Sequence, residues 1–351
     1  MAAAPVFADV DTGVDDAIAL IYLLASPDAE LVGIASTAGN VPVDQVCDNN
    51  LGLLDLCRVG GVPVSRGSER PLNASVRADS AVHGPQGLGY AELAPSSRRL
   101  AGDDAATAWV RAAHAAPGEL IGVATGPLTN LALALRQEPA LPKLLRQLVI
   151  MGGAYDHRGN TTPAAEWNIA FDPEAAAEVF AAWSATIAPE DPESIGPLSL
   201  PILCGLDVTR QIELTPEILA RLAAAANSTT VALSLDDERG RRSSASNPLI
   251  RVIEDATRFY LESYHDLGHG YLAHLHDPLA AAVALDPRLV ELQPATVDVE
   301  LTGTLTRGMT VTDWTGQWAR KPNALIAVRA DSARFFDLFV DRVGRFAGGL
   351  D

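Results

Sequence analysis

The sequence contains little cysteine. Only Cys47, Cys57 and Cys204 occur in 351 residues, and no two of them form a Cys-x-x-Cys pair. This number and spacing exclude a disulfide framework and a zinc site built from thiolates. We therefore interpret the three residues as ordinary thiols in a reducing compartment.

Positive charge is also scarce. The chain has 26 basic and 44 acidic residues, for a formal net charge of −18. Nucleic acids and anionic membranes bind basic surfaces, so the balance argues against both as partners and favours a neutral or cationic small molecule. No apolar run approaches the roughly 18 residues of a membrane span, and the start, MAAAPVFADV, lacks the features of a signal peptide. We therefore expect a cytoplasmic protein.

Short apolar runs alternate with segments of helical periodicity. We expect strands at 5–10, 30–37, 62–68, 119–126, 147–153 and 202–208, and helices at 15–26, 43–60, 103–117, 127–139 and 173–183. This alternation predicts a doubly wound α/β fold, with a mostly parallel sheet covered by helices on both faces. We expect one domain over residues 1–351, with a surface insertion at 184–201.

One acidic loop follows the first expected strand. ADVDTGVDD places Asp9, Asp11, Asp15 and Asp16 within nine positions, between two apolar segments. In parallel sheets, ligands bind beyond the carboxyl ends of the strands, where STAGN (36–40), TGPLTN (125–130) and MGGAYDHRGN (151–160) would also gather. Several carboxylates remain ionised in one site only if a cation neutralises them, and oxygen ligands favour calcium or magnesium.

A set of motifs resembles the inosine-uridine-preferring nucleoside hydrolases. DVDTGVDDAIA is similar to the N-terminal signature of that family. Further motifs follow in the family's order: TAGN (37–40), HGPQGLG (83–89), TGPLTN, MGGAYDHRGN, EWNIAFDPEAA (166–176), GLDVT (205–209) and HDP (276–278). The resemblance implies a doubly wound α/β fold, one tightly held calcium ion, and hydrolysis of ribonucleosides to free base and ribose.

The resemblance also implies roles for individual residues. The calcium ligands would be Asp11, Asp15, the carbonyl of Thr125 and Asp277, and Asp11 would also act as general base. The ribose hydroxyls would be bound by Asp16, Asn40, Asn160, Glu166 and Asn168. At the base, His276 is the candidate acid, His83 lines the pocket, and Tyr260 and Tyr264 share a helical face that packs in the core or stacks on the base. The family also implies a dimer or tetramer and a role in purine and pyrimidine salvage.

Other interpretations remain open at this stage. The chain could be a non-catalytic sugar- or nucleoside-binding protein on the same fold, or a phosphatase of the haloacid-dehalogenase type, which also begins with a strand ending in Asp-x-Asp. Gln86 stands where the family commonly has an acidic residue, and the preferred base is not evident from the motifs. We interpret the remaining histidines as structural or surface residues: His114, His157, His265, His269 and His274.

Overall fold

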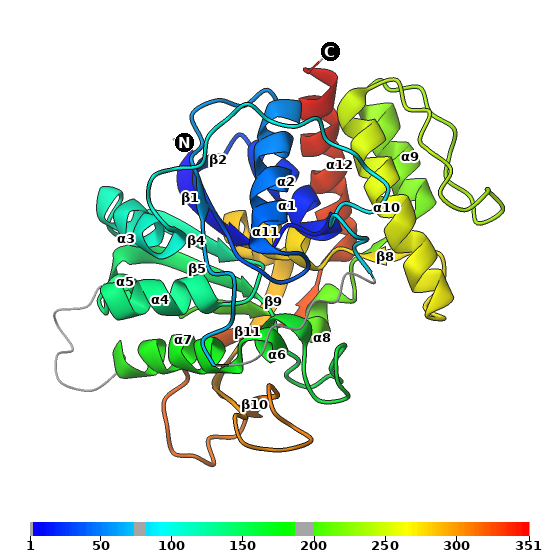
Figure 1. Cartoon of the computed structure of the whole chain (residues 1–351). Helices are drawn as coiled ribbons and strands as arrows, with labels where there is room; N and C mark the ends of the chain where they lie inside the picture. Colours follow the sequence, from blue (N-terminus) through cyan, green and yellow to red (C-terminus); the bar gives the residue numbers. More distant parts are fainter. Residues whose placement is uncertain (1–2, 74–81, 187–199, 351) are drawn as a thin grey trace.

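A nine-stranded sheet forms the centre of the protein (Figure 1). The computed structural model describes residues 3–73, 82–186 and 200–350. In the described part the strand order is β10-β9-β11-β6-β5-β4-β1-β2-β3. The strands are β1 (Ala4–Val10), β2 (Ala29–Ser36), β3 (Val64–Arg66), β4 (Leu120–Ala124), β5 (Leu145–Met151), β6 (Ile202–Cys204), β9 (Val290–Val299), β10 (Thr310–Asp313) and β11 (Ala324–Ala330).

Seven strands, from β11 across to β3, run parallel, and β9 and β10 add an antiparallel edge. The inner strands are buried along most of their length, and every residue of β4 is buried. Parallel strands covered on both faces are apolar for this reason. The predicted fold class is confirmed.

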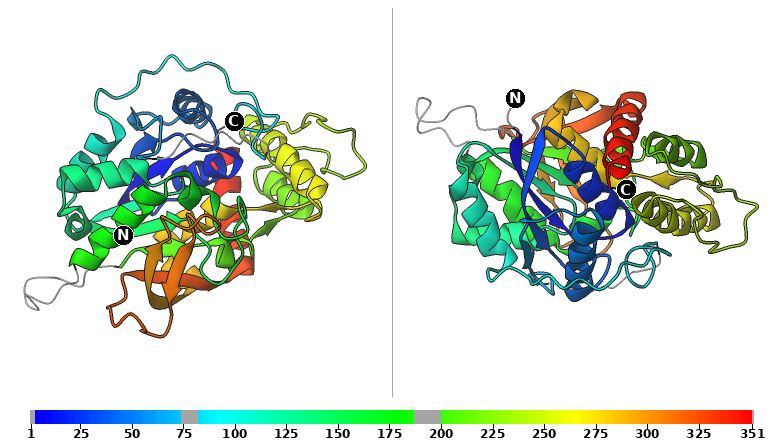
Figure 2. Two further views of the ribbon diagram at one scale, coloured as in Figure 1. Left: turned by 60° about the horizontal axis from the view of Figure 1, so that its bottom comes forward. Right: turned by 90° about the horizontal axis from the view of Figure 1, so that it is seen from above.

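Helices cover both faces of the sheet. Figures 1 and 2 show α1 (Val14–Leu24), α2 (Val43–Leu56), α11 (His276–Leu285) and α12 (Ser332–Gly348) on one face. On the other face lie α3 (Ala105–Ala115), α4 (Thr129–Gln137), α5 (Leu141–Leu144) and α7 (Pro173–Thr186). The apolar side chains of each layer form a separate hydrophobic cluster against the sheet.

A group of elements lies outside the sheet, next to α12. It contains α9 (Pro216–Ala225), α10 (Pro248–Asp266) and a two-stranded ladder of β7 (Glu213–Leu214) and β8 (Ala273–His274). Helix α10 begins where the sequence provides a cap: the Asn247 side chain accepts from the N–H groups of Leu249 and Ile250, with Pro248 in the first turn. The short elements α6 (Trp167–Phe171), α8 (Leu206–Thr209) and η1 (Pro287–Leu289) complete the described part.

The described structure differs locally from the elements expected from the sequence. The strand expected over 202–208 ends at Cys204, and Leu206–Thr209 form α8 instead, with the extended residue Gly205 as the N-cap of that helix. The antiparallel strands β9 and β10 have no counterpart among the strands expected from the sequence. Of the insertion expected at 184–201, residues 187–199 lie outside the described residues, and 184–186 belong to α7. In the described part of the chain, no helix has the length and apolarity to cross a membrane.

Candidate active site

The acidic loop lies where the sheet changes direction. From β1 the chain builds outward through β2 and β3, and then returns to place β4 on the other side of β1. Loops after β1 and β4 therefore separate at their shared edge and leave a crevice, the usual ligand position in doubly wound sheets. Asp11 follows β1 and Thr125 follows β4, so both lie at this crevice.

Two helix N-termini meet at the crevice. Asp15 and Asp16 lie in the first turn of α1, Asp277 lies in the first turn of α11, and the two helices pack against each other. Carboxylate oxygens of Asp15, Asp16 and Asp277 come within 4.8 Å of one another, and all three residues are buried. The helix N-termini supply partial positive charge to these acids. That partial charge is too small to offset three buried carboxylates.

Asp11 lies beside this group with one oxygen unsatisfied. Its Oδ2 accepts a 2.7 Å hydrogen bond from the Asn40 backbone N–H, whereas Oδ1 is buried and has no hydrogen-bond partner. A buried carboxylate oxygen without a partner is unfavourable. It indicates that a ligand or cation completes the site.

Burial and mutual repulsion oppose ionisation of this cluster. Burial, followed by the charge of Asp16, raises the pKa of Asp15 to about 8. Burial raises the pKa of Asp11 and of Asp277 well above the usual range, and neighbouring aspartates add to both shifts. A hard cation among these oxygens would reverse the shifts, because it favours the charged carboxylates. The donor set fits calcium or magnesium.

Asp9 does not belong to the cluster, although the sequence places it in the same acidic loop. Its carboxylate accepts hydrogen bonds from Trp109 Nε1 at 2.7 Å and Asn130 Nδ2 at 2.9 Å. Burial nevertheless raises its pKa to about 7. Asp9 therefore ties β1 to α3 and α4 on the opposite face of the sheet, and only the other three acids of the loop reach the crevice.

Asp16 is held by several donors. Its Oδ2 accepts from the Gly13 N–H at 2.9 Å and from Asn40 Nδ2 at 3.2 Å, and its Oδ1 accepts from Thr125 Oγ1 at 2.7 Å. The loops after β1, β2 and β4 thus share one carboxylate. This network fixes Asn40 and Thr125 at the pocket wall.

Glu166 and Asn168 lie at the start of helix α6. Glu166 caps α6: its carboxylate accepts from the N–H groups of Asn168 and Ile169, and also from Gly153 N–H at 2.9 Å. Asn168 Nδ2 donates to the Thr125 carbonyl at 2.6 Å and to the Met151 carbonyl at 3.2 Å. Asn160 Oδ1 accepts from Trp167 N–H at 2.9 Å. These bonds place all three predicted side chains along one wall.

The opposite end of the pocket is aromatic. Tyr260 and Tyr264 of α10 pack edge to face with ring centroids 4.9 Å apart, and both are buried. His276 Nδ1 is 2.7 Å from Thr209 Oγ1, and its Nε2 is 3.2 Å from the Tyr264 hydroxyl. Burial lowers the pKa of His276 well below its usual value, so the neutral ring predominates at neutral pH. His83 packs on Tyr260 at 5.3 Å and accepts from the Val14 N–H through Nδ1.

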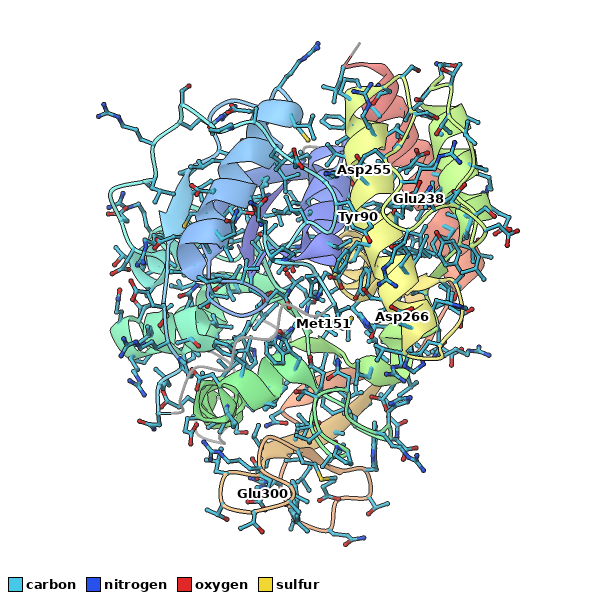
Figure 3. The ribbon with its side chains drawn as sticks, turned by 45° about the vertical axis from the view of Figure 1, so that its right-hand side comes forward. Tyr90, Met151, Glu238, Asp255, Asp266 and Glu300 are labelled. Carbon is cyan, nitrogen blue, oxygen red and sulfur yellow. The ribbon has the colours of Figure 1, made fainter. Side chains whose placement is uncertain are left out.

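These walls enclose a pocket of about 890 Å³, part of which is open to solvent. Met151, at the end of β5, lines it, and Figure 3 shows this residue near the centre of the molecule beside α10. The structure brings together at this pocket or its acidic floor every site residue predicted from the sequence: Asp11, Asp15, Asp16, Asn40, His83, Thr125, Asn160, Glu166, Asn168, Tyr260, Tyr264, His276 and Asp277.

Several lining residues were not predicted as site residues. His269, interpreted from the sequence as structural or surface, lines the pocket, as do Arg210, Met151, Thr161 and Trp167. Arg210 directly follows the GLDVT motif and Trp167 lies inside EWN. Their positions in or next to these motifs could have identified both as pocket residues. His269 had no such signal, because only the packing of α10 against β8 brings it to the pocket.

A doubly wound sheet with a carboxylate-lined pocket at its switch point is the general architecture of an α/β enzyme. The sequence model of "Inosine-uridine preferring nucleoside hydrolase" matches residues 6–337. The chain therefore belongs to the inosine-uridine preferring nucleoside hydrolase family, whose members are enzymes that hydrolyse N-glycosidic bonds. This assignment excludes the haloacid-dehalogenase alternative.

Individual relatives agree with the family over nearly the whole chain. A pyrimidine-specific ribonucleoside hydrolase RihA of Citrobacter koseri is 35% identical over 98% of this chain and 99% of its own. An inosine-uridine preferring nucleoside hydrolase of Leishmania major is 32% identical over 96% of each chain. The solved structure of a purine-preferring ribonucleoside hydrolase from Gardnerella vaginalis has a TM-score of 0.84 and 31% identity, covering 98% of this chain and 99% of its own.

A substitution at Gly39 tests whether the position of the Asp11 carboxylate matters for activity. A Cβ at residue 39 would lie 2.7 Å from Asp11 Cγ and closer still to Oδ2, where no space exists. We predict that Gly39→Ala displaces the Asp11 carboxylate and lowers kcat on the order of a hundredfold, as expected for a misplacement of about 1 Å. The measurement is steady-state release of base from a ribonucleoside.

Gly60→Ala is the matched control, because a Cβ at residue 60 meets no atom within 4 Å. The control should keep the wild-type rate. Wild-type kinetics in Gly39→Ala would show that the Asp11 carboxylate can move without consequence.

Proposed function

We propose that the protein is a calcium-dependent hydrolase that cleaves the N-glycosidic bond of ribonucleosides into free base and ribose. The observation that carries the proposal is the buried cluster of Asp15, Asp16 and Asp277, with Asp11 beside it, at one end of a pocket whose opposite end is aromatic. Heterolysis of a glycosidic bond builds positive charge on the sugar and negative charge on the leaving group. The carboxylate end of the pocket matches the positive charge on the sugar.

Asp11, Asp15, the Thr125 carbonyl and Asp277 are the residues that would hold the calcium ion. All offer the hard oxygen atoms that calcium prefers, and Asp11 Oδ1 has no other partner. When bound, the ion supplies positive charge that neutralises the carboxylates and acidifies a coordinated water. The Thr125 carbonyl keeps its hydrogen bond from Asn168, which orients it.

Asp11 is the proposed general base. The Asn40 backbone N–H holds one of its oxygens at 2.7 Å, which leaves Oδ1 directed to a different partner. A general base needs a fixed carboxylate with a free oxygen near the attacking water, and its pKa must allow ionisation at the working pH. Neighbouring positive charge would lower the raised pKa of Asp11 and produce the ionised form.

The ribose is the proposed occupant of the carboxylate end. Asp16, Asn40, Asn160, Glu166 and Asn168 present amide and carboxylate groups there, and their own hydrogen bonds fix their orientation. Groups fixed in this way favour a substrate that carries all of its hydroxyls, because a missing hydroxyl leaves a buried polar atom without a partner.

The base is the proposed occupant of the aromatic end. Tyr260, Tyr264 and His83 form its walls. His276 is the candidate acid for the leaving base, although the burial that lowers its pKa opposes the protonated form that this role needs. Thr209 fixes the ring of His276 through Nδ1, and Nε2 faces the Tyr264 hydroxyl. The role in purine and pyrimidine salvage, the cytoplasmic location and the dimeric or tetrameric assembly remain predictions from the family resemblance.

Calcium binding can be tested by thermal unfolding. Removal of divalent cations should destabilise the protein, because buried carboxylates then repel one another. Restoring calcium to a hundredfold above its dissociation constant should add about 2.7 kcal/mol. We predict that Asp277→Asn raises the Tm of the metal-free protein and abolishes the rise on adding calcium.

Asp298→Asn is the control for this experiment, since Asp298 is half exposed and pairs with Arg320 far from the pocket. It should respond to calcium as the wild type does. Bound metal is quantified by elemental analysis; zinc in place of calcium, or a full calcium response in Asp277→Asn, would refute the assigned ligands.

Replacement of the general base should separate chemistry from folding. We predict that Asp11→Asn keeps the wild-type far-UV circular dichroism and loses turnover on the order of a hundredfold or more. Calcium content is measured on the same sample, because the lost charge also weakens metal binding. Near-normal turnover with the metal retained would assign the base role to another residue.

A substrate pair tests both the reaction and the sugar site. We predict that the protein releases uracil and a reducing sugar from uridine and is slower on 2′-deoxyuridine by several kcal/mol in transition-state free energy, since buried polar groups lose a partner. Binding of uridine without base release would favour the non-catalytic alternative. Equal rates on the two substrates would contradict the ribose assignment alone.

A further inference from the structure

Arg210 places a permanent positive charge at the aromatic end of the pocket. It follows α8, precedes β7 and lines the same pocket as Tyr264, His269 and His276. Among the described residues that line this pocket it is the only arginine or lysine. An arginine is protonated at any physiological pH, so this cation does not depend on a proton from solvent.

The guanidinium has no protein counter-charge. No described carboxylate forms an ion pair with Arg210, even though the chain contains 44 acidic residues. Its Nε is buried and has no hydrogen-bond partner. A guanidinium offers five donors, and leaving a buried one unused is unfavourable unless a ligand accepts from it.

The backbone around Arg210 is held beside the other residues of the aromatic end of the pocket. Glu213 and Leu214 of β7 pair with His274 and Ala273 of β8, and Leu275 N–H donates to the Ile212 carbonyl at 3.0 Å. The preceding residue, Thr209, bonds to His276 at 2.7 Å. This ladder holds the segment after α8 beside the segment that leads into α11. Arg210 is therefore kept at the aromatic end.

We propose that Arg210 contacts the nucleobase and stabilises the negative charge that develops on it as the glycosidic bond breaks. This inference rests on the proposed function. The C1′–N bond breaks with its electron pair retained by the base, the attacking water forms the new C1′–O bond, and its proton passes to Asp11. The base leaves as an anion beside the guanidinium and then takes up one proton, while Asp11 returns its proton to solvent, so the enzyme is regenerated and the reaction balances.

A fixed cation suits this task for two reasons. Charge stabilisation by a preorganised donor is strong where water is excluded, and no reorganisation is needed as the charge appears. In addition, a guanidinium donates to ring nitrogens and exocyclic oxygens of a base through several geometries. Arg210 therefore contributes to leaving-group activation without transferring a proton.

The test compares leaving groups in the calcium-loaded enzyme. Arg210→Gln should lower kcat on uridine and inosine on the order of a hundredfold, the usual cost of removing one preorganised donor. The same variant should lose little on p-nitrophenyl riboside, whose leaving group is already a stable anion. Arg210→Lys should retain part of the uridine activity, and added guanidinium chloride should partly restore Arg210→Gln.

Arg221→Gln is the matched control, because Arg221 of α9 forms an exposed ion pair with Asp337 of α12 and the variant should behave as the wild type. The Tm of Arg210→Gln should match the wild type, since no ion pair is lost. Equal losses on uridine and p-nitrophenyl riboside, or no loss on uridine, would overturn the role of Arg210. A wild-type enzyme that releases no base would instead overturn the proposed function.

Discussion

Burial of carboxylates at the meeting point of two helices is the constraint around which this structure is organised. Asp15 and Asp16 begin α1 and Asp277 begins α11, and the two helices pack so that these acids come within 4.8 Å. The apolar runs that follow each acid bury the helices and leave the acids with little exposure to water. Folding therefore accumulates negative charge in one place, and a cation that binds there stabilises the folded chain.

The rest of the pocket is built around this charge in two parts. Loops after β1, β2, β4 and β5 supply the polar wall. Asp16 bonds groups from the first three of these loops, and Glu166 bonds Gly153 after β5 and the first turn of α6. The aromatic end instead comes from α10 and the β7–β8 ladder, which lie outside the sheet. The polar end thus belongs to the rigid sheet edge, whereas the aromatic end belongs to elements that can differ without disturbing the sheet.

Much of the fold and the site was predictable from the sequence for a local reason. The alternation of apolar runs with helical periodicity is set by residues close in the chain, and it predicts the order of strands and helices up to β6. The polar motifs after those strands had to gather at one edge, because parallel strands share their carboxyl ends. The predicted site residues accordingly lie at one pocket or on its acidic floor.

The remaining features depended on tertiary contacts. Asp9 and Asp11 look equivalent in the sequence, yet Asp9 bonds to Trp109 and Asn130 on the far face, because the strand and its turn direct the two side chains differently. The antiparallel strands β9 and β10, the positions of His269 and Arg210, and the cap formed by Glu166 likewise required long-range packing. The sequence by itself determined the order of the main strands and helices up to β6 and the acidic motif. Only the tertiary structure decided which acids share the crevice and which charges surround the pocket, because burial and distance set those interactions and neither is local in the chain.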